Sequence, residues 1–396
     1  MIRTALLLTL AVALATPALA EDFGVSAPEV AGRASVDEGR FSLALTTFSR
    51  SGQAQRVVKG EVVRRTPTAL TLRYEVEAAG ERGFIDALLL RPAPVVRVTE
   101  TATLRARAGG WEGTVAGVAQ RWVRQGALEG DTVVLVVPGL STNLWNQYGV
   151  PYLDENLAAL RARGLEARRL AVNTEESIAV NAAVIAREVR TEVARGKRVV
   201  LLAHSKGGAD TITALADPTN RDLLPHVRGL MAIQPVYGGS PIADLVGGSC
   251  AIQGTVDLFF ERALPRINRV DDVGSRDAVR DLRSETRQAL LRRHPYPAAE
   301  VPTVVLRSSF SGRSTFKPRH VLRKPLFVFQ KFLEKTQGVA SDGMVSLEWQ
   351  RVPGAAAEIT LQDMDHFEPG FRGESPHSPC KVTNLIVDRM AAVLAD

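Results

Sequence analysis

The chain has 396 residues, 45% of them apolar and 23% charged, and its formal net charge at pH 7 is +6. This is the composition of a globular protein, so it excludes a largely disordered chain. The positive charge comes mainly from scattered arginines, and no basic run is interleaved with aromatic residues, so the sequence does not indicate nucleic-acid binding.

The first twenty residues have the pattern of a secretory signal peptide. Arg3 gives a basic start, and residues 5–15 are apolar apart from Thr9. Ala18 and Ala20 then supply the small residues of a cleavage site. The apolar run is shorter than the roughly 20 residues that a membrane-spanning helix needs, which disfavours the alternative of a membrane anchor. We predict cleavage after Ala20 and a mature protein that is periplasmic or secreted.

Residues 21–125 are predicted to be rich in β-strands. Apolar and polar side chains alternate from Leu70 to Val76 and, less regularly, from Val96 to Leu104. A period of two places one face of a strand in a core and the other in solvent. Turn signals at Ala79–Gly80 and Gly109–Gly110 separate the strands. We expect an antiparallel sheet here, whose last strands are candidates for joining the main sheet of the protein.

From about residue 130 the pattern changes to strands that alternate with helices. The unbroken apolar runs Thr132–Val137 and Val199–Ala203 suit strands that are buried on both faces. Between them, apolar residues from Ile178 to Val193 recur with the period of an amphipathic helix. This alternation predicts a mostly parallel sheet covered by helices, and such sheets bind ligands at the carboxyl ends of their strands.

A serine lies between the second of these strands and the next predicted helix. In the segment 203–207 (Ala-His-Ser-Lys-Gly), small residues stand two positions before and two positions after Ser205. A sharp strand–turn–helix reversal requires small residues there, and it exposes the serine at the edge of the sheet. The pattern is G-x-S-x-G with Ala203 in place of the first glycine. It predicts a nucleophilic Ser205; the alternative is a serine that only caps the helix.

A serine nucleophile needs a base and an acid that orients the base, and after this kind of turn they follow in the order acid, then histidine. Asp342 lies in a loop of small residues, whereas Glu334 lies in a helical stretch and is predicted to be on the surface. His366 follows the short predicted strand 356–361, where the base is expected. His377, near the start of the last helix, is the alternative base.

Attack on an acyl group places negative charge on the former carbonyl oxygen, which requires hydrogen-bond donors. We predict that these donors are the backbone N–H groups of Lys206, directly after the nucleophile, and of Leu140, in the loop after the first central strand. Gly139 allows close approach of that loop, although an ordinary turn at the strand end is the alternative. For the Lys206 side chain we prefer an exposed position to a cation at the pocket rim.

Taken together, these residues resemble the α/β-hydrolase superfamily, and within it the bacterial secreted lipases and esterases. The resemblance covers roughly residues 130–396. It implies an α/β-hydrolase fold over residues 126–396, with a mostly parallel sheet covered by helices, a helical cap inserted at 236–300 and the β-rich region 21–125 as an N-terminal extension. The matching segments are 138–140, 204–208, 234–244, 341–345 and 365–368.

The resemblance implies an exported serine hydrolase that cleaves a hydrophobic, lipid-like carboxylic ester. Ser205 would attack the ester carbonyl, His366 would take the serine proton, and Asp342 would orient His366. Two alternatives stay open, namely an acyltransferase that uses the same three residues and a non-catalytic binding protein on a hydrolase scaffold. The sequence also leaves open a transient contact with a lipid surface and the oligomeric state.

No cofactor and no metal are predicted. Related lipases carry a structural calcium, and Glu368 matches one ligand position, but no aspartate between Phe310 and Ser341 supplies a second ligand.

The two cysteines, Cys250 and Cys380, both lie in the part predicted to be exported. An oxidising compartment permits one disulfide between them, and two buried free thiols are the alternative.

Overall fold

The computed structural model describes residues 21–37, 39–49, 51–79, 95–107, 109–140, 142, 151–248, 273–310, 323–372 and 376–396. The predicted signal peptide and Cys250 lie outside these ranges, as does the stretch 249–272 of the predicted cap. Within the described ranges, no helix is long and apolar enough to cross a membrane.

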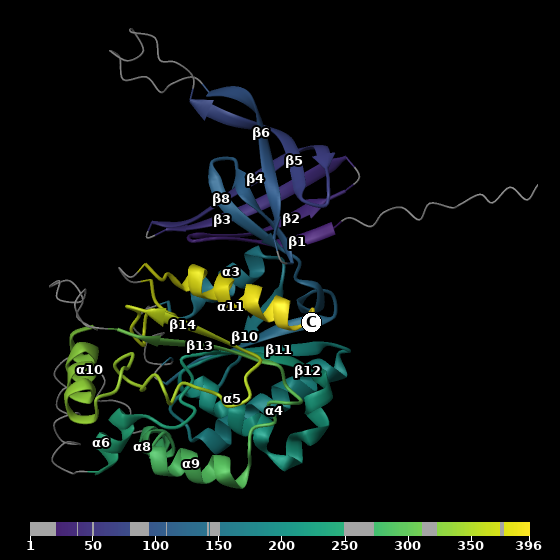
Figure 1. Ribbon diagram of the computed structural model, residues 1–396. Helices are drawn as coiled ribbons and strands as arrows, with labels where there is room; N and C mark the ends of the chain where they lie inside the picture. Colours follow the sequence, from purple (N-terminus) through teal and green to yellow (C-terminus); the bar gives the residue numbers. More distant parts are fainter. Residues whose placement is uncertain are drawn as a thin grey trace, which may run out of the picture.

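The N-terminal part of the chain is a closed antiparallel β-barrel whose eight strands pair in sequential order (Figure 1). β1 pairs with β2 on one side and with β8 on the other, and this closes the barrel. Closure leaves the barrel without the two free edges of an open sheet. The strands are β1 (Glu21–Ala27), β2 (Val30–Val36), β3 (Arg40–Ser49), β4 (Gly52–Arg65), β5 (Ala69–Ala79), β6 (Val95–Arg107), β7 (Gly110–Val115) and β8 (Val118–Val123).

The predicted alternation in β5 is confirmed, because its apolar residues from Leu70 to Val76 are buried in the barrel core. In β6 the prediction is right only at the C-terminal end. Leu104 is buried, whereas Val98 is 40% exposed. The pairing of β4 with β5 runs only from Tyr74 to Leu70, while β5 and β6 stay paired as far as Ala79 and Val95. The two strands therefore extend beyond the barrel as an arm (Figure 1).

The C-terminal part of the chain is built on a six-stranded parallel sheet with the order β10-β9-β11-β12-β13-β14. All neighbouring strands of this sheet are parallel. The two central strands predicted from unbroken apolar runs are its neighbours β9 and β11. The strands are β9 (Thr132–Val137), β10 (Glu166–Arg169), β11 (Arg198–His204), β12 (Val227–Ile233), β13 (Thr303–Ser309) and β14 (Ala357–Gln362).

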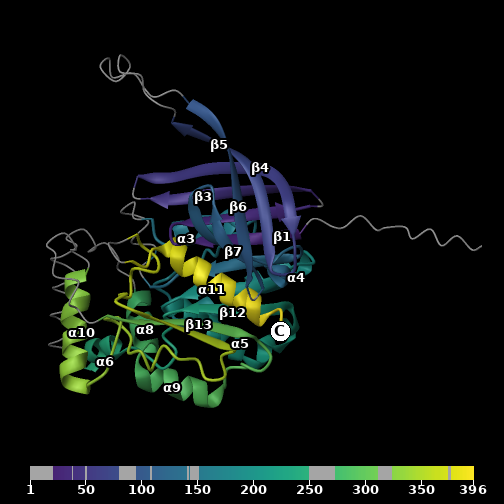
Figure 2. The ribbon, with the colours of Figure 1, turned by 45° about the horizontal axis from the view of Figure 1, so that its top comes forward.

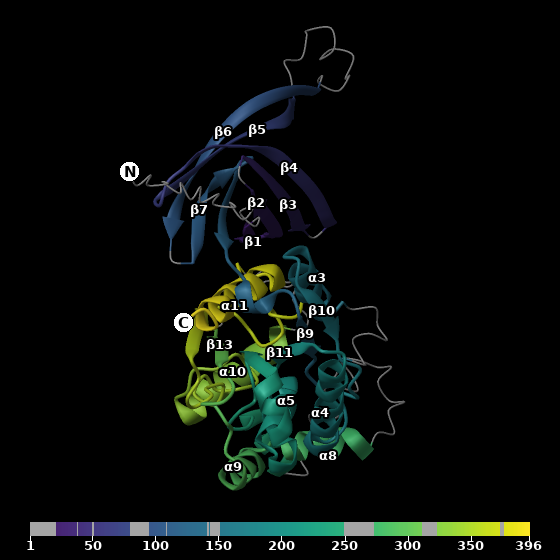
Figure 3. The ribbon, with the colours of Figure 1, turned by 90° about the vertical axis from the view of Figure 1, so that its right-hand side faces the viewer.

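Helices cover both faces of the parallel sheet (Figure 3). On one face, Val133 and Leu135 of β9 pack in a core with α4 and α5. On the other face, Val134 and Val136 pack in a second core with α3 and α11. Successive residues of one strand thus enter opposite cores, which is why β9 needs an unbroken apolar run. The helices are α3 (Asp154–Ala162), α4 (Ile178–Ala194), α5 (Lys206–Ala216), α6 (Pro241–Gly248), α8 (Val273–Asp281), α9 (Ser284–Arg293), α10 (Arg323–Gln337) and α11 (Pro379–Val393), and the 3₁₀ segments are η1 (Gly126–Leu128) and η2 (Pro218–His226).

The predicted fold class, an α/β-hydrolase fold with an N-terminal β-rich extension and a helical cap, is wrong as a description of this chain. The N-terminal strands form a closed barrel around a core of their own, and none of them joins the parallel sheet. The physical reason lies in the pairing of β1 with β8, which joins residues about one hundred positions apart. Alternation within single strands contains no information on such a pairing.

The barrel packs on α3 and α11, which lie between it and the parallel sheet (Figure 2). Arg163, directly after α3, is fully buried. Its guanidinium donates to Asp388 (2.6 Å) and Asn384 (3.1 Å) of α11, and to Gln125 (2.8 Å), which follows the last barrel strand. Ser26 of β1 donates to the same Asp388 carboxylate (2.8 Å). A buried cation with polar partners on each side therefore joins the two parts.

We expect Arg163→Ala to lower the free energy of unfolding by about 3 kcal/mol, because it removes the cation of a buried ion pair and leaves polar groups unpaired. Urea denaturation measures this. Arg107→Ala is the matched control, since Arg107 pairs with Glu112 on the exposed side of the barrel (3.0 Å) and such a pair contributes about 0.5 kcal/mol. Equal losses in both variants would contradict a central role for Arg163.

Candidate active site

Ser205 stands at the turn between β11 and α5, as predicted from its small neighbours. Its φ is +56° and its ψ is −126°, a conformation that costs a non-glycine residue about 1–3 kcal/mol. Its side chain makes no capping hydrogen bond to the helix, which argues against the alternative of a capping serine. A Cβ atom at Gly207 would lie 2.5 Å from the carbonyl oxygen of Pro138, so only glycine fits there.

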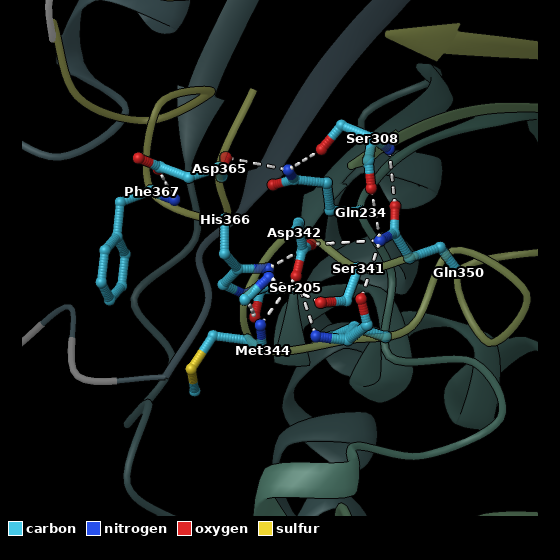
Figure 4. Close-up of polar contacts among 12 residues, drawn as sticks. Ser205, Gln234, Ser308, Ser341, Asp342, Met344, Gln350, Asp365, His366 and Phe367 are labelled. Atoms are coloured by element: carbon cyan, nitrogen blue, oxygen red, sulfur yellow. Dashed lines mark hydrogen bonds and ion pairs between the residues drawn. The ribbon is translucent and has the colours of Figure 1, made fainter. Parts of the chain in front are cut away.

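The structure brings Ser205, His366 and Asp342 together at the carboxyl edge of the sheet (Figure 4). The Ser205 Oγ lies 2.7 Å from the Nε2 of His366. The Nδ1 of His366 lies 2.7 Å from the Oδ2 of Asp342. All three side chains are buried. Because the carboxylate can only accept at Nδ1, the proton of a neutral His366 lies on Nδ1 and its Nε2 faces the serine hydroxyl as an acceptor.

The loop around Asp342 is folded to hold its carboxylate in place. The backbone N–H groups of Met344 (2.9 Å) and Val345 (2.8 Å) donate to Oδ1. The side chain of Gln350 donates to Oδ2 (3.2 Å), so the oxygen that faces His366 is also fixed. The backbone N–H of His366 in turn donates to the Asp342 carbonyl oxygen (3.0 Å). The sequence motif did not indicate Gln350, which lies eight residues beyond the aspartate.

His366, and not the alternative His377, is the histidine in contact with Ser205. The Nε2 of His377 lies 2.9 Å from the carbonyl oxygen of Gln362. Glu334, which was predicted to be a surface residue, forms an exposed ion pair with Lys331 (2.6 Å). The order of acid and base along the chain thus selected the residues that meet.

The two predicted oxyanion donors belong to segments that converge on Ser205. Lys206 is the first residue of α5, where a helix leaves its N–H groups without intrahelical acceptors. Leu140 lies at the end of the described part of its loop, since residues 141 and 143–150 are outside the described ranges. The neighbouring N–H of Gly139 donates to the hydroxyl of Tyr152 (3.3 Å). The Gly139 N–H is therefore engaged, and the oxyanion roles of Lys206 and Leu140 stay predictions.

The side chain of Lys206 is neither exposed nor at a pocket rim, and that prediction is wrong. It is 1% exposed, and its Nζ lies 2.9 Å and 3.0 Å from the carboxylate oxygens of Asp210. The amide of Asn181 also donates to Asp210 (3.0 Å). Burial raises the pKa of Asp210 to about 6, although Lys206 acts against this shift. The i, i+4 spacing of Lys206 and Asp210 on one helix was the available sequence signal.

A second histidine lies beside the first and was missed as a site residue. The ring of His204 is buried, and its centroid lies 5.2 Å from that of His366. Burial and the neighbouring His366 lower the pKa of His204 from 6.5 to about 3. His204 is therefore neutral at physiological pH, and the two rings do not repel each other as two cations would.

Among the residues that the structure describes, no group of three or more His, Cys, Asp or Glu side chains is arranged to hold a metal ion. Glu368, which matches a calcium ligand of related lipases, is buried and accepts from the backbone N–H of Asp365 (2.9 Å). Cys380 is buried, and its candidate disulfide partner Cys250 lies outside the described residues, so the predicted disulfide is not tested. Burial raises the pKa of the Cys380 thiol, which disfavours the thiolate.

No protein-family model matches this sequence, and no curated protein matches it. Among solved structures, the metagenomic carboxyl esterase MGS0156 is similar with a TM-score of 0.51, at 20% identity over 66% of this chain and 75% of that chain. Lipase 1 from Pelosinus fermentans has a TM-score of 0.48, at 13% identity over 65% of this chain and 98% of that chain. The mature Bacillus licheniformis lipase BlEst2 has a TM-score of 0.44, at 20% identity over 59% of this chain and 84% of that chain.

The similarity to the carboxyl esterase shows a shared fold. The resemblance inferred from the sequence is thereby confirmed at the level of the fold.

The low pKa of His204 makes stability depend on pH with a definite sign. As the pH falls below 6.5, the unfolded chain takes up a proton that the buried ring does not, so stability is lost progressively toward pH 3. Between pH 7 and pH 5, the titration of His204 lowers the free energy of unfolding by about 2 kcal/mol. We expect His204→Gln, which cannot titrate, to lose about 2 kcal/mol less than the wild type over this range in urea denaturation. Equal losses would show that His204 is protonated in the folded protein.

Proposed function

We propose that this protein is an exported serine hydrolase that cleaves carboxylic esters of a hydrophobic, lipid-like class. The observation that carries the proposal is the unbroken hydrogen-bond chain from Ser205 through His366 to Asp342, with both contacts at 2.7 Å. A nucleophile, a base and an acid in this relation are the recurring machinery of acyl transfer. The fold shared with a carboxyl esterase supports the same chemistry.

In the first half of the reaction, the Ser205 Oγ attacks the ester carbonyl carbon while the Nε2 of His366 takes the serine proton. The Asp342 carboxylate stabilises the imidazolium that forms. The backbone N–H groups of Lys206 and Leu140 donate to the oxyanion, and the positive end of α5 favours the same charge. The ester C–O bond then breaks, His366 gives its proton to the departing alcohol, and the acyl group stays on Ser205.

In the second half, a water molecule attacks the acyl-enzyme while His366 takes one of its protons. The second tetrahedral intermediate collapses, His366 returns the proton to the Ser205 Oγ, and the carboxylic acid leaves. Neither half requires a cofactor, because the Nε2 of His366 receives each proton, first from Ser205 and then from water, and passes it on to the departing alcohol and back to Ser205.

The substrate class and the location are inferred from two patterns in the sequence. The apolar sequence cluster Val256, Leu258, Phe259, Phe260 and Leu264 lies outside the described residues; it is suited to contact with an acyl chain, and plain core is the alternative. Export is supported by the pattern of a signal peptide over residues 1–20, which also lies outside them. We infer from these two patterns a periplasmic or secreted enzyme that acts on apolar esters.

We expect Ser205→Ala and His366→Ala each to lower kcat for nitrophenyl ester hydrolysis by about 10⁴-fold or more, because either change removes the nucleophile–base pair. Asp342→Asn should cost a similar factor, since an amide no longer holds His366 in the required tautomer. Initial rates over a series of acyl chain lengths measure these effects and the substrate preference together.

His377→Ala is the matched control, because it removes the other candidate base from a half-buried position without touching the three residues. It should keep the wild-type rate.

Adding an alcohol to the same assay separates hydrolysis from acyl transfer, since an acyltransferase would form the new ester at the expense of free acid. Background rates at every chain length in the wild type would refute the esterase proposal.

A further inference from the structure

A line of buried polar side chains runs beside Ser205 and plays no part in the mechanism above. It begins at the backbone N–H of Gly139, which donates to the Tyr152 hydroxyl (3.3 Å). That hydroxyl is hydrogen-bonded to the Nδ1 of His204. The Nε2 of His204 lies 3.0 Å from the Oε1 of Gln234, at the end of β12. Tyr152, His204 and Gln234 are all buried.

The line ends in the loop that carries His366 (Figure 4). The amide nitrogen of Gln234 donates to the backbone carbonyl of Asp365, which directly precedes His366 (3.0 Å). It also donates to the Ser308 hydroxyl. Ser308 donates onward to the carbonyl of Met364 in the same loop (3.0 Å). The line therefore spans from the loop of Leu140 to the loop of His366.

The two ends of this line and the neutral state of His204 fix the direction of its hydrogen bonds. The carbonyl of Asp365 can only accept, so Gln234 must present its nitrogen there and its oxygen to His204. The Nε2 of His204 must then carry a proton, and in the neutral ring that burial favours, Nδ1 accepts from the Tyr152 hydroxyl. At the other end, the N–H of Gly139 can only donate to the Tyr152 oxygen. This arrangement satisfies both ends with a neutral His204, the form that burial favours.

We propose that Tyr152, His204 and Gln234 are positioning residues for the ester hydrolysis proposed above. In this role a neutral His204 connects the loop of Leu140 to the loop of His366 and fixes the position of one loop relative to the other. The inference rests on the proposed function. The three residues do not touch the reacting atoms; they act through Gly139, which precedes the predicted donor Leu140, and through Asp365, which precedes the base.

The electrostatics of the site agree with a neutral bridge. Burial lowers the pKa of His204 to about 3, so protonation does not compete with the arrangement above at neutral pH. A cation at His204, 5.2 Å from the ring of His366, would oppose the imidazolium that forms there during acylation. A buried network that is fully satisfied also keeps its geometry better than an apolar contact would.

The first test removes the hydroxyl group from each of two buried tyrosines in turn and compares the effects on kcat. Tyr152→Phe leaves the Gly139 N–H without its acceptor, and we expect kcat for a nitrophenyl ester to fall about tenfold while KM changes less than about twofold. Tyr296→Phe is the matched control, since the Tyr296 hydroxyl is also buried and bonds to Thr303 (2.7 Å), away from Ser205. The control should keep the wild-type kcat.

The second test measures whether any neutral side chain at position 204 that has one hydrogen-bond donor and one acceptor keeps kcat near the wild-type value. His204→Leu removes both functions and should lower kcat about tenfold or more, whereas His204→Gln keeps one donor and one acceptor and should recover kcat to within about threefold of the wild type. Equal loss in the two variants would overturn the bridging role. If His204→Leu does not fold, the decision rests on Tyr152→Phe and His204→Gln.

The outcomes separate this inference from the proposed function. An inactive wild type would refute the esterase proposal itself. A fully active wild type with unchanged kcat in Tyr152→Phe would refute the positioning role and leave the esterase proposal standing. An equal fall of kcat in Tyr152→Phe and Tyr296→Phe would also refute it, because the effect would then follow general stability.

Discussion

The sharp backbone turn at Ser205 is the constraint on which the rest of the site depends. It places a non-glycine residue at a φ of +56° and brings the start of α5 so close to the end of β9 that a side chain at Gly207 would meet the Pro138 carbonyl. The same close approach sets Lys206 beside the loop of Leu140. The strain of the turn is stored locally and is held by the buried strands on either side of β11.

Around that turn the protein keeps an unusual set of polar groups away from water. The ion pair of Lys206 and Asp210 lies within the first turns of α5, and the line from Tyr152 to Gln234 includes His204, the residue before Ser205. Such groups are costly to bury unless each one is paired, but when paired they hold a single geometry. The site is thus shaped by hydrogen-bond complementarity as much as by packing.

The barrel contributes none of the three central residues, yet it is not an independent attachment. It packs on α3 and α11 through the buried Arg163. It also reaches the far end of the loop that carries His366, where Arg372 makes a bidentate contact with Glu155 of α3 (2.6 and 2.7 Å) and an ion pair with Glu29 of the barrel (2.7 Å). The barrel therefore supports the helices and the loop on which the site depends.

The sequence by itself determined the features that short segments encode. Period-two alternation indicated β5 and the C-terminal end of β6, unbroken apolar runs indicated β9 and β11, and the small residues around Ser205 indicated the turn, because each is a local steric requirement. Only the tertiary structure decided that β1 closes on β8, that Lys206 is buried against Asp210, and that His204, Gln234 and Gln350 hold the site. These contacts depend on which distant segments meet in the folded chain. The sequence alone does not show whether water or a buried partner satisfies the hydrogen bonds of a polar side chain.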